Sequence, residues 1–361
     1  MNPKVIIDLD KLKSNIHFLT HKLSSQNLSI TVITKGHSAD PEIVKLFEEF
    51  PEIEYLGDSR IYNLKTYQKS SKKKIMIRIP MSSEIEEVVR YADVSFNSEL
   101  KTLRLLNKAA KQQRKIHEVL LMVDLGDLRE GIFDENELLE IVSEMVELRY
   151  LKLIGLGTNL SCFGGVIPEY ENLNRLVILK DKIESLYHFN LSMISGGSSS
   201  SLYLLDQRER ALPKGVTNLR IGEAYLFGRE AAWGTDYEDM HQDVFTLSAK
   251  IVELKQKPSY PIGKIGVDAF GNCPSFIDKG IRLRGVLAIG KQDVAIDKLS
   301  SLDEKLEIVG ASSDHLIVDF TDSENQYHVG DDLLFRLEYV SMLTAFTSKY
   351  VKKEYKGTMT I

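Results

Sequence analysis

Short apolar runs alternate with amphipathic stretches over the first two thirds of the chain. Apolar residues at helical spacing predict helices such as Glu99–Gln112, Glu135–Glu147 and Glu169–Tyr187. Strands are expected between them, at Ile30–Thr34, Ile53–Leu56, Ile75–Ile79, Asp93–Phe96, Glu118–Asp124, Leu151–Leu156, Leu191–Ile194 and Asn218–Ile221. Eight strands that alternate with helices are typical of a (β/α)8 TIM barrel. An open doubly wound sheet is the alternative, because the pattern alone does not show closure.

The pattern changes beyond Trp233. From Val244 onward, apolar residues alternate with polar ones, and Gly and Asp clusters separate the runs. The expected strands are Phe245–Leu254, Ile281–Ile289, Leu306–Val309 and Leu316–Phe320. This period-2 pattern predicts a C-terminal antiparallel β-domain. We therefore expect a barrel over residues 1–238 and a β-domain over residues 239–361.

Composition narrows the class of protein. The chain has 361 residues, of which 43% are hydrophobic and 27% charged, and this is ordinary for a globular protein with two domains. A net charge of −6 argues against nucleic acid as a partner. No apolar stretch approaches the length of a membrane span, and the first residues lack a signal-peptide core. The two cysteines, Cys162 and Cys273, show no metal-type spacing. We expect a reduced, cytoplasmic protein without a structural disulfide, membrane contact or metal site.

Lys35 is the first candidate for chemistry. It ends the apolar run Ile30–Thr34 and is followed by Gly36, which is typical of a buried parallel strand with a lysine at its carboxyl end. At that end of a barrel strand, a lysine can project into the mouth where ligands bind. Desolvation eases the loss of its proton and makes the amine a nucleophile suited to Schiff-base chemistry. A lysine that extends from a strand end into water is the alternative.

The strand and helix expected within residues 5–23, followed by the strand that bears Lys35, resemble the start of the alanine racemase-like family. These enzymes use pyridoxal 5'-phosphate. The resemblance extends over nearly the whole chain, with barrel first and β-domain second, and is closest to the alanine/ornithine racemase branch. It implies that Lys35 carries the cofactor as an internal aldimine.

Two segments are candidates for binding the cofactor. A serine-glycine cluster at 195–201 directly follows a predicted strand, and small residues with free N–H groups and hydroxyls can surround a phosphate dianion. The resemblance implies phosphate contacts from Ser198 and Ser199. It also implies that Arg220 meets the pyridine nitrogen and that the Gly222 backbone meets phosphate. Because arginine stays charged, it cannot protonate that nitrogen, which suits reversible proton transfer better than decarboxylation.

Other segments are candidates for binding the substrate. Arg129 follows a strand that ends at Asp124, and we expect it to hold the substrate carboxylate in a bidentate fork, although a local ion pair with Asp127 or Glu130 is an alternative. Asn159 stands where the family often has a histidine near the cofactor ring, so we expect it to position the ring. In the β-domain, the segment 309–315 resembles a second family motif, which implies substrate contacts from Ser313 and Asp314.

The second acid–base group is harder to assign. Where alanine racemases carry a catalytic tyrosine, this chain has Val267 with Asp268 beside it. Asp268 is favoured by position, because a buried aspartate can have a raised pKa. His315 is favoured by chemistry, because imidazole titrates near neutral pH. Tyr339 or Tyr350 is a further alternative.

The resemblance implies a racemase that interconverts L- and D-amino acids (alanine, ornithine or similar) by removing and returning the Cα proton, with Lys35 as the base on one face. It also implies a homodimer whose β-domain completes the active site of the partner subunit. The alternatives are a barrel decarboxylase or aldolase, a non-catalytic pyridoxal-phosphate-binding protein, and a barrel that binds a phosphorylated metabolite. Arg220 argues against a decarboxylase and the β-domain against the small cofactor-binding proteins. A metal-dependent aldolase would need Cys273 with His315 or His328.

Overall fold

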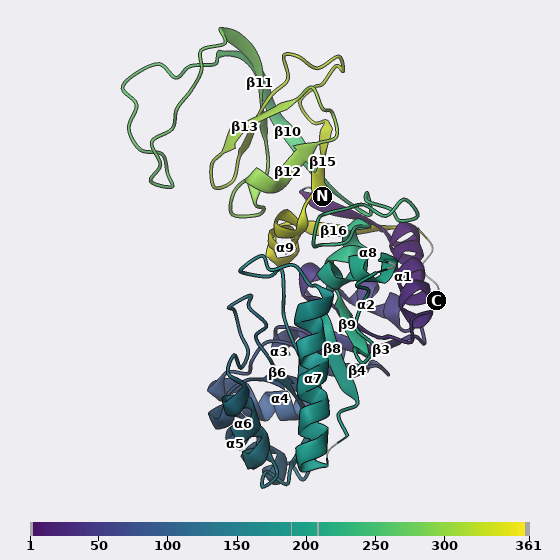
Figure 1. Cartoon of the computed structure of the whole chain (residues 1–361). Coiled ribbons are helices and arrows are strands. Elements are labelled where there is room, and N and C mark those ends of the chain that lie inside the picture. The colour runs from purple at the N-terminus through teal and green to yellow at the C-terminus, as the bar shows by residue number, and fades with distance from the viewer. Residues whose placement is uncertain (1–2, 189, 208, 358–361) are drawn as a thin grey trace. The chain divides into compact units, whose positions relative to one another are not determined.

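The computed structural model describes residues 3–188, 190–207 and 209–357, and the chain forms two compact units (Figure 1). One unit is Leu12–Gln242. The other joins the chain before Leu12 to the chain after Gln242.

The first unit is built on a closed barrel of eight parallel strands that pair in chain order. The last strand pairs with the first, with Arg220 opposite Thr31, so the sheet has no edge. The predicted TIM barrel is confirmed, and the open sheet is excluded. The strands are β2 (Ser29–Ile33), β3 (Ile53–Asp58), β4 (Lys73–Met76), β5 (Val94–Asn97), β6 (His117–Met122), β7 (Leu151–Gly157), β8 (Met193–Ser198) and β9 (Asn218–Ile221).

Helices connect the strands and lie outside the barrel, with the long helix α7 beside β7 and β8 (Figure 1). Local sequence fixes several starts: Asp40 caps α2 before a proline, and Asp134 accepts the Glu137 N–H at the start of α6. The helices are α1 (Leu9–Ser24), α2 (Pro41–Phe47), α3 (Ile61–Thr66), α4 (Ile85–Tyr91), α5 (Leu100–Gln112), α6 (Glu135–Met145), α7 (Tyr170–Tyr187) and α8 (Glu223–Phe227).

Large side chains fill the barrel interior, so it is a core and not a pore. The buried cluster consists of Tyr55, Ile75, Val94, Phe96, Leu120, Met122, Ile154 and Met193. Gly155 lets two strands approach closely, because a Cβ there would lie 1.7 Å from the Met193 carbonyl oxygen. Polar side chains can therefore gather at the end of the barrel that the carboxyl ends of the strands form.

The second unit is mainly antiparallel, as predicted, and its main path runs β12-β15-β10-β11-β14-β13. Its strands are β1 (Lys4–Asp8), β10 (Phe245–Pro258), β11 (Ile281–Leu287), β12 (Leu299–Ser301), β13 (Glu307–Ala311), β14 (Leu316–Asp319), β15 (Asp332–Leu337) and β16 (Lys352–Lys356), with the helix α9 (Tyr339–Thr347).

The observed units differ from the expected domains 1–238 and 239–361, because the first strand belongs to the β-domain and not to the barrel. β1 pairs antiparallel with β10 and parallel with β16, so its backbone hydrogen bonds are made within the β-domain. The division after the barrel falls at Gln242, four residues beyond the expected position. A strand pattern at residues 5–9 identifies a strand but not its partner, which lies far along the chain.

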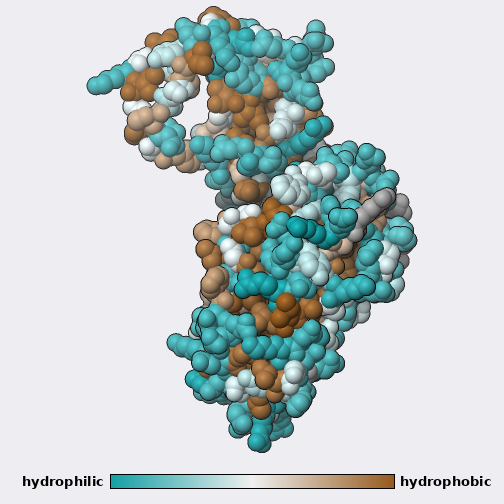
Figure 2. All heavy atoms as spheres, viewed as in Figure 1, coloured by the Kyte–Doolittle hydropathy of each residue, from teal (hydrophilic) through white to brown (hydrophobic). Residues whose placement is uncertain are grey.

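A long loop, residues 259–280, connects β10 to β11 and projects from the second unit (Figure 1). Hydrophobic residues are interspersed with polar ones on its surface (Figure 2). Ile262, Val267 and Ile277 are 91%, 69% and 77% exposed. Apolar side chains gathered on one exposed loop are typical of a contact surface.

Candidate active site

Lys35 lies two residues past the end of β2, in the short 3₁₀ turn Lys35–His37. Burial lowers the pKa of its ammonium group, and the nearby guanidinium groups of Arg129 and Arg220 lower it further, although Cys162 and Asp58 oppose the shift. Within the described ranges, no hydrogen bond or ion pair holds the Lys35 Nζ atom. A half-buried amine with a lowered pKa and no partner is free to react.

Hydrogen bonds of His37, which is fully buried, hold the turn that carries Lys35 in place. The Tyr225 hydroxyl, on α8, donates to the Ile33 carbonyl (2.8 Å) and lies 3.1 Å from His37 Nε2. His37 Nδ1 accepts the Asp40 N–H at 3.1 Å, which places the imidazole proton on Nε2. The turn closes through Ser38 and Ala39, both with positive φ (51° and 55°). Lys35 is thus held by a rigid support that also contacts α8.

His37 should make the free energy of unfolding depend on pH in the acid range. Burial lowers its pKa from 6.5 to about 3, so the folded chain keeps it neutral while the unfolded chain binds a proton below 6.5. Stability contributed by this residue is therefore lost as the pH falls from 6.5 toward 3. Between pH 6 and 4, His37→Gln should reduce the slope of unfolding free energy against pH by about 1.4 kcal/mol per pH unit. Urea unfolding at several pH values measures both slopes, and equal slopes would contradict the buried neutral imidazole.

Arg220 lies on β9 with only 3% of its surface exposed. Its guanidinium donates to the Ser195 hydroxyl (2.7 Å), the Thr158 carbonyl (2.6 Å) and the Asn159 side-chain oxygen (2.6 Å). Its carbon atom lies 5.4 Å from the centre of the Phe96 ring. Burial lowers the pKa of Arg220 to about 10, so it remains charged at neutral pH. Arg220 is thus a buried cation, and the three groups that accept hydrogen bonds from its guanidinium are neutral.

Arg129 and Asn159 meet at Glu130. Arg129 donates to both carboxylate oxygens of Glu130, at 2.8 Å from Nη2 to Oε1 and through a second contact from Nε to Oε2. Although burial opposes the charge of Arg129, these bonds raise its pKa. The Asn159 Nδ2 atom donates to Glu130 Oε1 at 2.5 Å. The fork expected to hold a substrate carboxylate is thus occupied by a neighbour, which is the ion-pair alternative of the sequence analysis.

Two aspartates hold the loops that present these groups. Asp124, at the end of the predicted strand, accepts the N–H groups of Gly126 (2.8 Å) and Leu128 (3.2 Å). Asp127 is 1% exposed and accepts three backbone N–H groups of the loop after β7, from Cys162, Phe163 and Val166. Asp127 is therefore structural, and it ties the Arg129 loop to the Asn159 loop.

The predicted phosphate-binding cluster forms the end of β8 and the start of a 3₁₀ helix, Ser199–Asp206. The hydroxyls of Ser198 and Ser200 lie 3.2 Å apart. The Ser199 hydroxyl accepts the N–H groups of Gly222 and Ala224, both at 3.2 Å, at the start of α8. Ser198, Ser199 and Gly222 are thus brought together, although the Gly222 N–H already has an acceptor.

Several polar groups at this end of the barrel were not identified from the sequence. Ser195 and Asn218 hydrogen-bond to each other (2.9 Å) beneath Arg220. Asn97 Oδ1, at the end of β5, and Thr158 Oγ1, directly after β7, are buried and make no hydrogen bond to any described residue. A polar side chain within a strand that is buried on both faces is the signal that would have found them.

These residues fit pyridoxal phosphate. The site offers the reactive amine of Lys35, the buried cation of Arg220 and the serine hydroxyls that follow Gly196 and Gly197. It also offers the buried side-chain oxygens of Asn97 and Thr158, which make no hydrogen bond to a described residue. Gly222 leaves room beside β2, because a Cβ there would lie 3.3 Å from the Ile33 Cβ atom. Groups of three or more His, Cys, Asp or Glu side chains able to hold a metal ion do not occur among the residues described. The chemistry of the donors thus matches an organic phosphate with a reactive carbonyl.

The candidates of the β-domain lie in two turns of the second unit. Asp268 accepts the N–H groups of Phe270 (2.9 Å) and Asn272 (2.8 Å) in the loop 259–280. The backbone bond from Asn272 lowers its pKa, which corrects the expectation that burial would raise it. His315 lies in the turn between β13 and β14, with its Nδ1 atom 3.2 Å from Asp314 Oδ1.

The other two candidates lie in the same turn as His315. The Ser313 hydroxyl donates to Asp314 at 3.1 Å and lowers the pKa of that carboxyl. Asp314 and His315 have exposed side chains. Ser313, Asp314 and His315 thus form one solvent-facing group.

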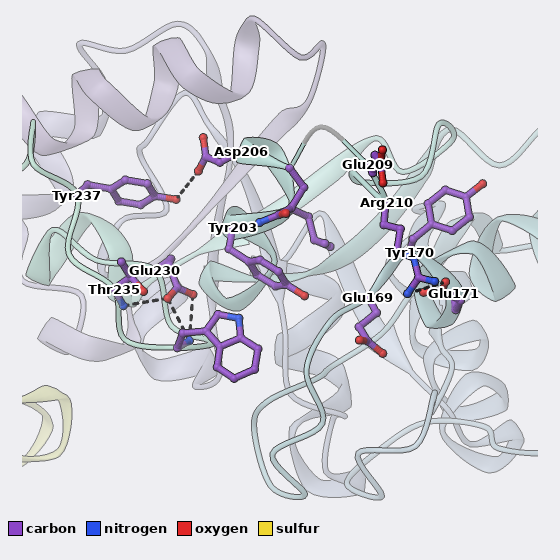
Figure 3. A pocket seen from close by; sticks show the side chains of 13 residues that line it. Glu169, Tyr170, Glu171, Tyr203, Asp206, Glu209, Arg210, Glu230, Thr235 and Tyr237 are labelled. Carbon is purple, nitrogen blue, oxygen red and sulfur yellow. Dashed lines mark hydrogen bonds and ion pairs between the residues drawn. The ribbon is translucent and has the colours of Figure 1, made fainter.

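A separate groove of about 560 Å³ lies on the barrel unit between the start of α7 and the loop after α8 (Figure 3). Tyr203 and Trp233 meet edge to face in it, and Glu230 accepts backbone N–H groups of Trp233 and Thr235. The Ala231 N–H donates to the Ser199 carbonyl, so this loop also supports the phosphate-binding cluster. None of the predicted site residues lines the groove.

Comparison with known proteins identifies the family of the chain. A family model described as alanine racemase, N-terminal domain, matches residues 7–230. An ornithine racemase of Acetoanaerobium sticklandii is 50% identical over 354 residues, covering 98% of this chain and 99% of the relative. The chain belongs to the alanine racemase family. Within it, a lysine racemase of Thermotoga maritima is 34% identical, with 99% of each chain covered.

The fold agrees with this family. The structure of an alanine racemase from Bartonella henselae with covalently bound pyridoxal phosphate has a TM-score of 0.74. It shares 15% sequence identity and covers 99% of this chain and 100% of its own. The predictions of the family, of an amino-acid racemase and of pyridoxal phosphate as cofactor are confirmed, since enzymes of the alanine racemase family use this cofactor.

Proposed function

We propose that this racemase acts on a basic amino acid, ornithine or lysine, and that the reaction takes place at Lys35. The similarity to ornithine racemase and lysine racemase over nearly the whole chain carries the proposal for the substrate. The unpartnered Lys35 amine, close to two guanidinium groups, carries the proposal for the place.

Several residues of the barrel mouth have roles in this proposal. Pyridoxal phosphate, when bound, withdraws electrons from the substrate Cα and so acidifies its proton. Lys35 would hold the cofactor, and its amine would take the Cα proton on one face, because its lowered pKa provides a neutral amine at lower pH than an exposed lysine. Ser198, Ser199 and the Gly222 segment hold the phosphate. Arg220 would meet the ring nitrogen as a permanent cation, and Asn159, which accepts a hydrogen bond from Arg220, would help to position the ring.

Substrate choice is tested by racemisation assays with ornithine, lysine and alanine. A site that binds the side-chain ammonium rejects a substrate that lacks it, so kcat/KM for ornithine or lysine should exceed that for alanine by about 10²-fold or more. The Lys35→Ala variant provides the blank. Equal efficiency with alanine would contradict a basic substrate.

The second proton-transfer group is proposed to come from the β-domain of a partner subunit. Asp268 is the weaker donor, because a carboxyl with a lowered pKa stays ionised at neutral pH. We therefore favour His315, whose exposed imidazole ring carries two nitrogens that can serve as hydrogen-bond donor and acceptor. The exposed apolar side chains of the loop 259–280 support a contact with a second copy. Ser313 and Asp314 are proposed to approach the substrate with His315.

A complementation assay tests the shared site. Lys35→Ala and His315→Gln homodimers should both be nearly inactive. Refolding an equal mixture should restore about a quarter of the wild-type activity, because half of the dimers are mixed and each then holds one intact site. Mixed dimers without activity would contradict a site shared between subunits.

Helices of the described residues are all too short or too polar to cross a bilayer. Both cysteines are free thiols, which supports a reducing, cytoplasmic location.

A further inference from the structure

The barrel mouth carries three cationic side chains, Lys35, Arg129 and Arg220, whose charges influence one another. Among the residues that the structure describes, Glu130 supplies the one carboxylate that hydrogen-bonds to any of these three. Arg220 is the most buried of them and makes no ion pair within the described ranges. An interior guanidinium without a carboxylate normally needs compensation from elsewhere.

The Asn159 amide links Glu130 to Arg220. Its oxygen accepts from Arg220 Nη2 at 2.6 Å, and its nitrogen donates to Glu130 at 2.5 Å. A flipped amide would place N–H groups against the guanidinium and an oxygen against the carboxylate, so only one orientation satisfies both neighbours. Glu130 therefore selects the orientation that gives Arg220 an acceptor.

We infer that Glu130 is a positioning residue that fixes both arginines of the barrel mouth, Arg129 through a direct fork and Arg220 through the Asn159 amide. Its charge also acts on Arg220, since Glu130 opposes the fall of the Arg220 pKa that burial causes. The consequence for cofactor chemistry rests on the proposed function, in which Arg220 faces the ring nitrogen. The link between the residues does not rest on it.

The first test uses the cofactor-free protein and a double-mutant cycle. Glu130→Gln should lower the urea midpoint of unfolding in the wild-type background, because one oxygen is lost as an acceptor. In the Arg220→Lys background, where the bond from the guanidinium to Asn159 is already gone, the same change should lower the midpoint by less than half as much. The matched control is Glu144→Gln, which removes a surface pair with Arg104 (2.8 Å) and should act equally in both backgrounds. Equal effects of Glu130→Gln in both backgrounds would overturn the inference.

The second test uses the protein with pyridoxal phosphate bound. Glu130→Gln should shift the pH at which the bound cofactor changes its absorbance by at least half a unit, and Arg220→Lys should remove most of that shift. A shift that persists fully in the Arg220→Lys background would show that Glu130 acts by another route. A wild-type protein without any cofactor absorbance would refute the proposed function, whereas the unfolding cycle would still decide the link between Glu130 and Arg220.

Discussion

Lys35→Ala should abolish racemisation, with a loss of at least about 10³-fold, because it removes both the cofactor attachment and one proton-transfer group. The cofactor should no longer become fixed to the protein on borohydride reduction. The fold should survive, because the Lys35 Nζ atom has no hydrogen bond or ion pair to lose within the described chain, and removal of a buried charge relieves a desolvation cost.

The matched control is Lys45→Ala. Lys45 is a surface lysine whose side chain is 70% exposed and pairs with Glu42 one turn away. Such pairs contribute about 0–1 kcal/mol, so activity and stability should stay near wild type. Full activity of Lys35→Ala, or equal losses in both variants, would refute the assignment.

Arg220→Glu should produce the second large effect. A carboxyl group can share a proton with the ring nitrogen, whereas a guanidinium cannot, so the variant should stabilise carbanion character and permit transamination. Racemisation should fall by about 10²-fold or more, since a preorganised charged donor is replaced by an acceptor. The Thr158 carbonyl and Asn159 oxygen would also lose their donor.

Arg220→Lys separates charge from geometry. The ammonium keeps the cation but not the fork, so racemisation should fall without transamination. Chromatography of products after long incubation with substrate measures both reactions. A transamination rate in Arg220→Glu that equals the wild-type rate would argue against contact between residue 220 and the ring.

The barrel was predictable because a strand buried on both faces leaves a continuous apolar run. Asn218–Ile221 matches the observed strand, whereas β4 starts at Lys73, two residues before the expected Ile75. The difference arises at the amino-terminal end of β4, where Lys73 and Lys74 continue the ladder without an apolar signal.

The site was partly predictable for the same reason. Lys35 and Arg220 stood out as charges at the ends of buried strands, and the structure places each within the electrostatic influence of the other. The bond from Asn159 to Glu130, 29 residues away, was not predictable, because it depends on how two loops are tied together by Asp127. The lowered pKa of Asp268 depends on turn hydrogen bonds that the sequence does not reveal.

The pairing of β1 with β16 has a consequence for biosynthesis. Residues 12–242 form one contiguous unit, so the barrel can complete its contacts as soon as that segment has left the ribosome. The first strand, by contrast, needs residues 352–356, which are synthesised about 350 positions later. During translation β1 therefore waits with an unpaired parallel edge, and the synthesis of residues 352–356 sets the time at which β1 and β16 can pair.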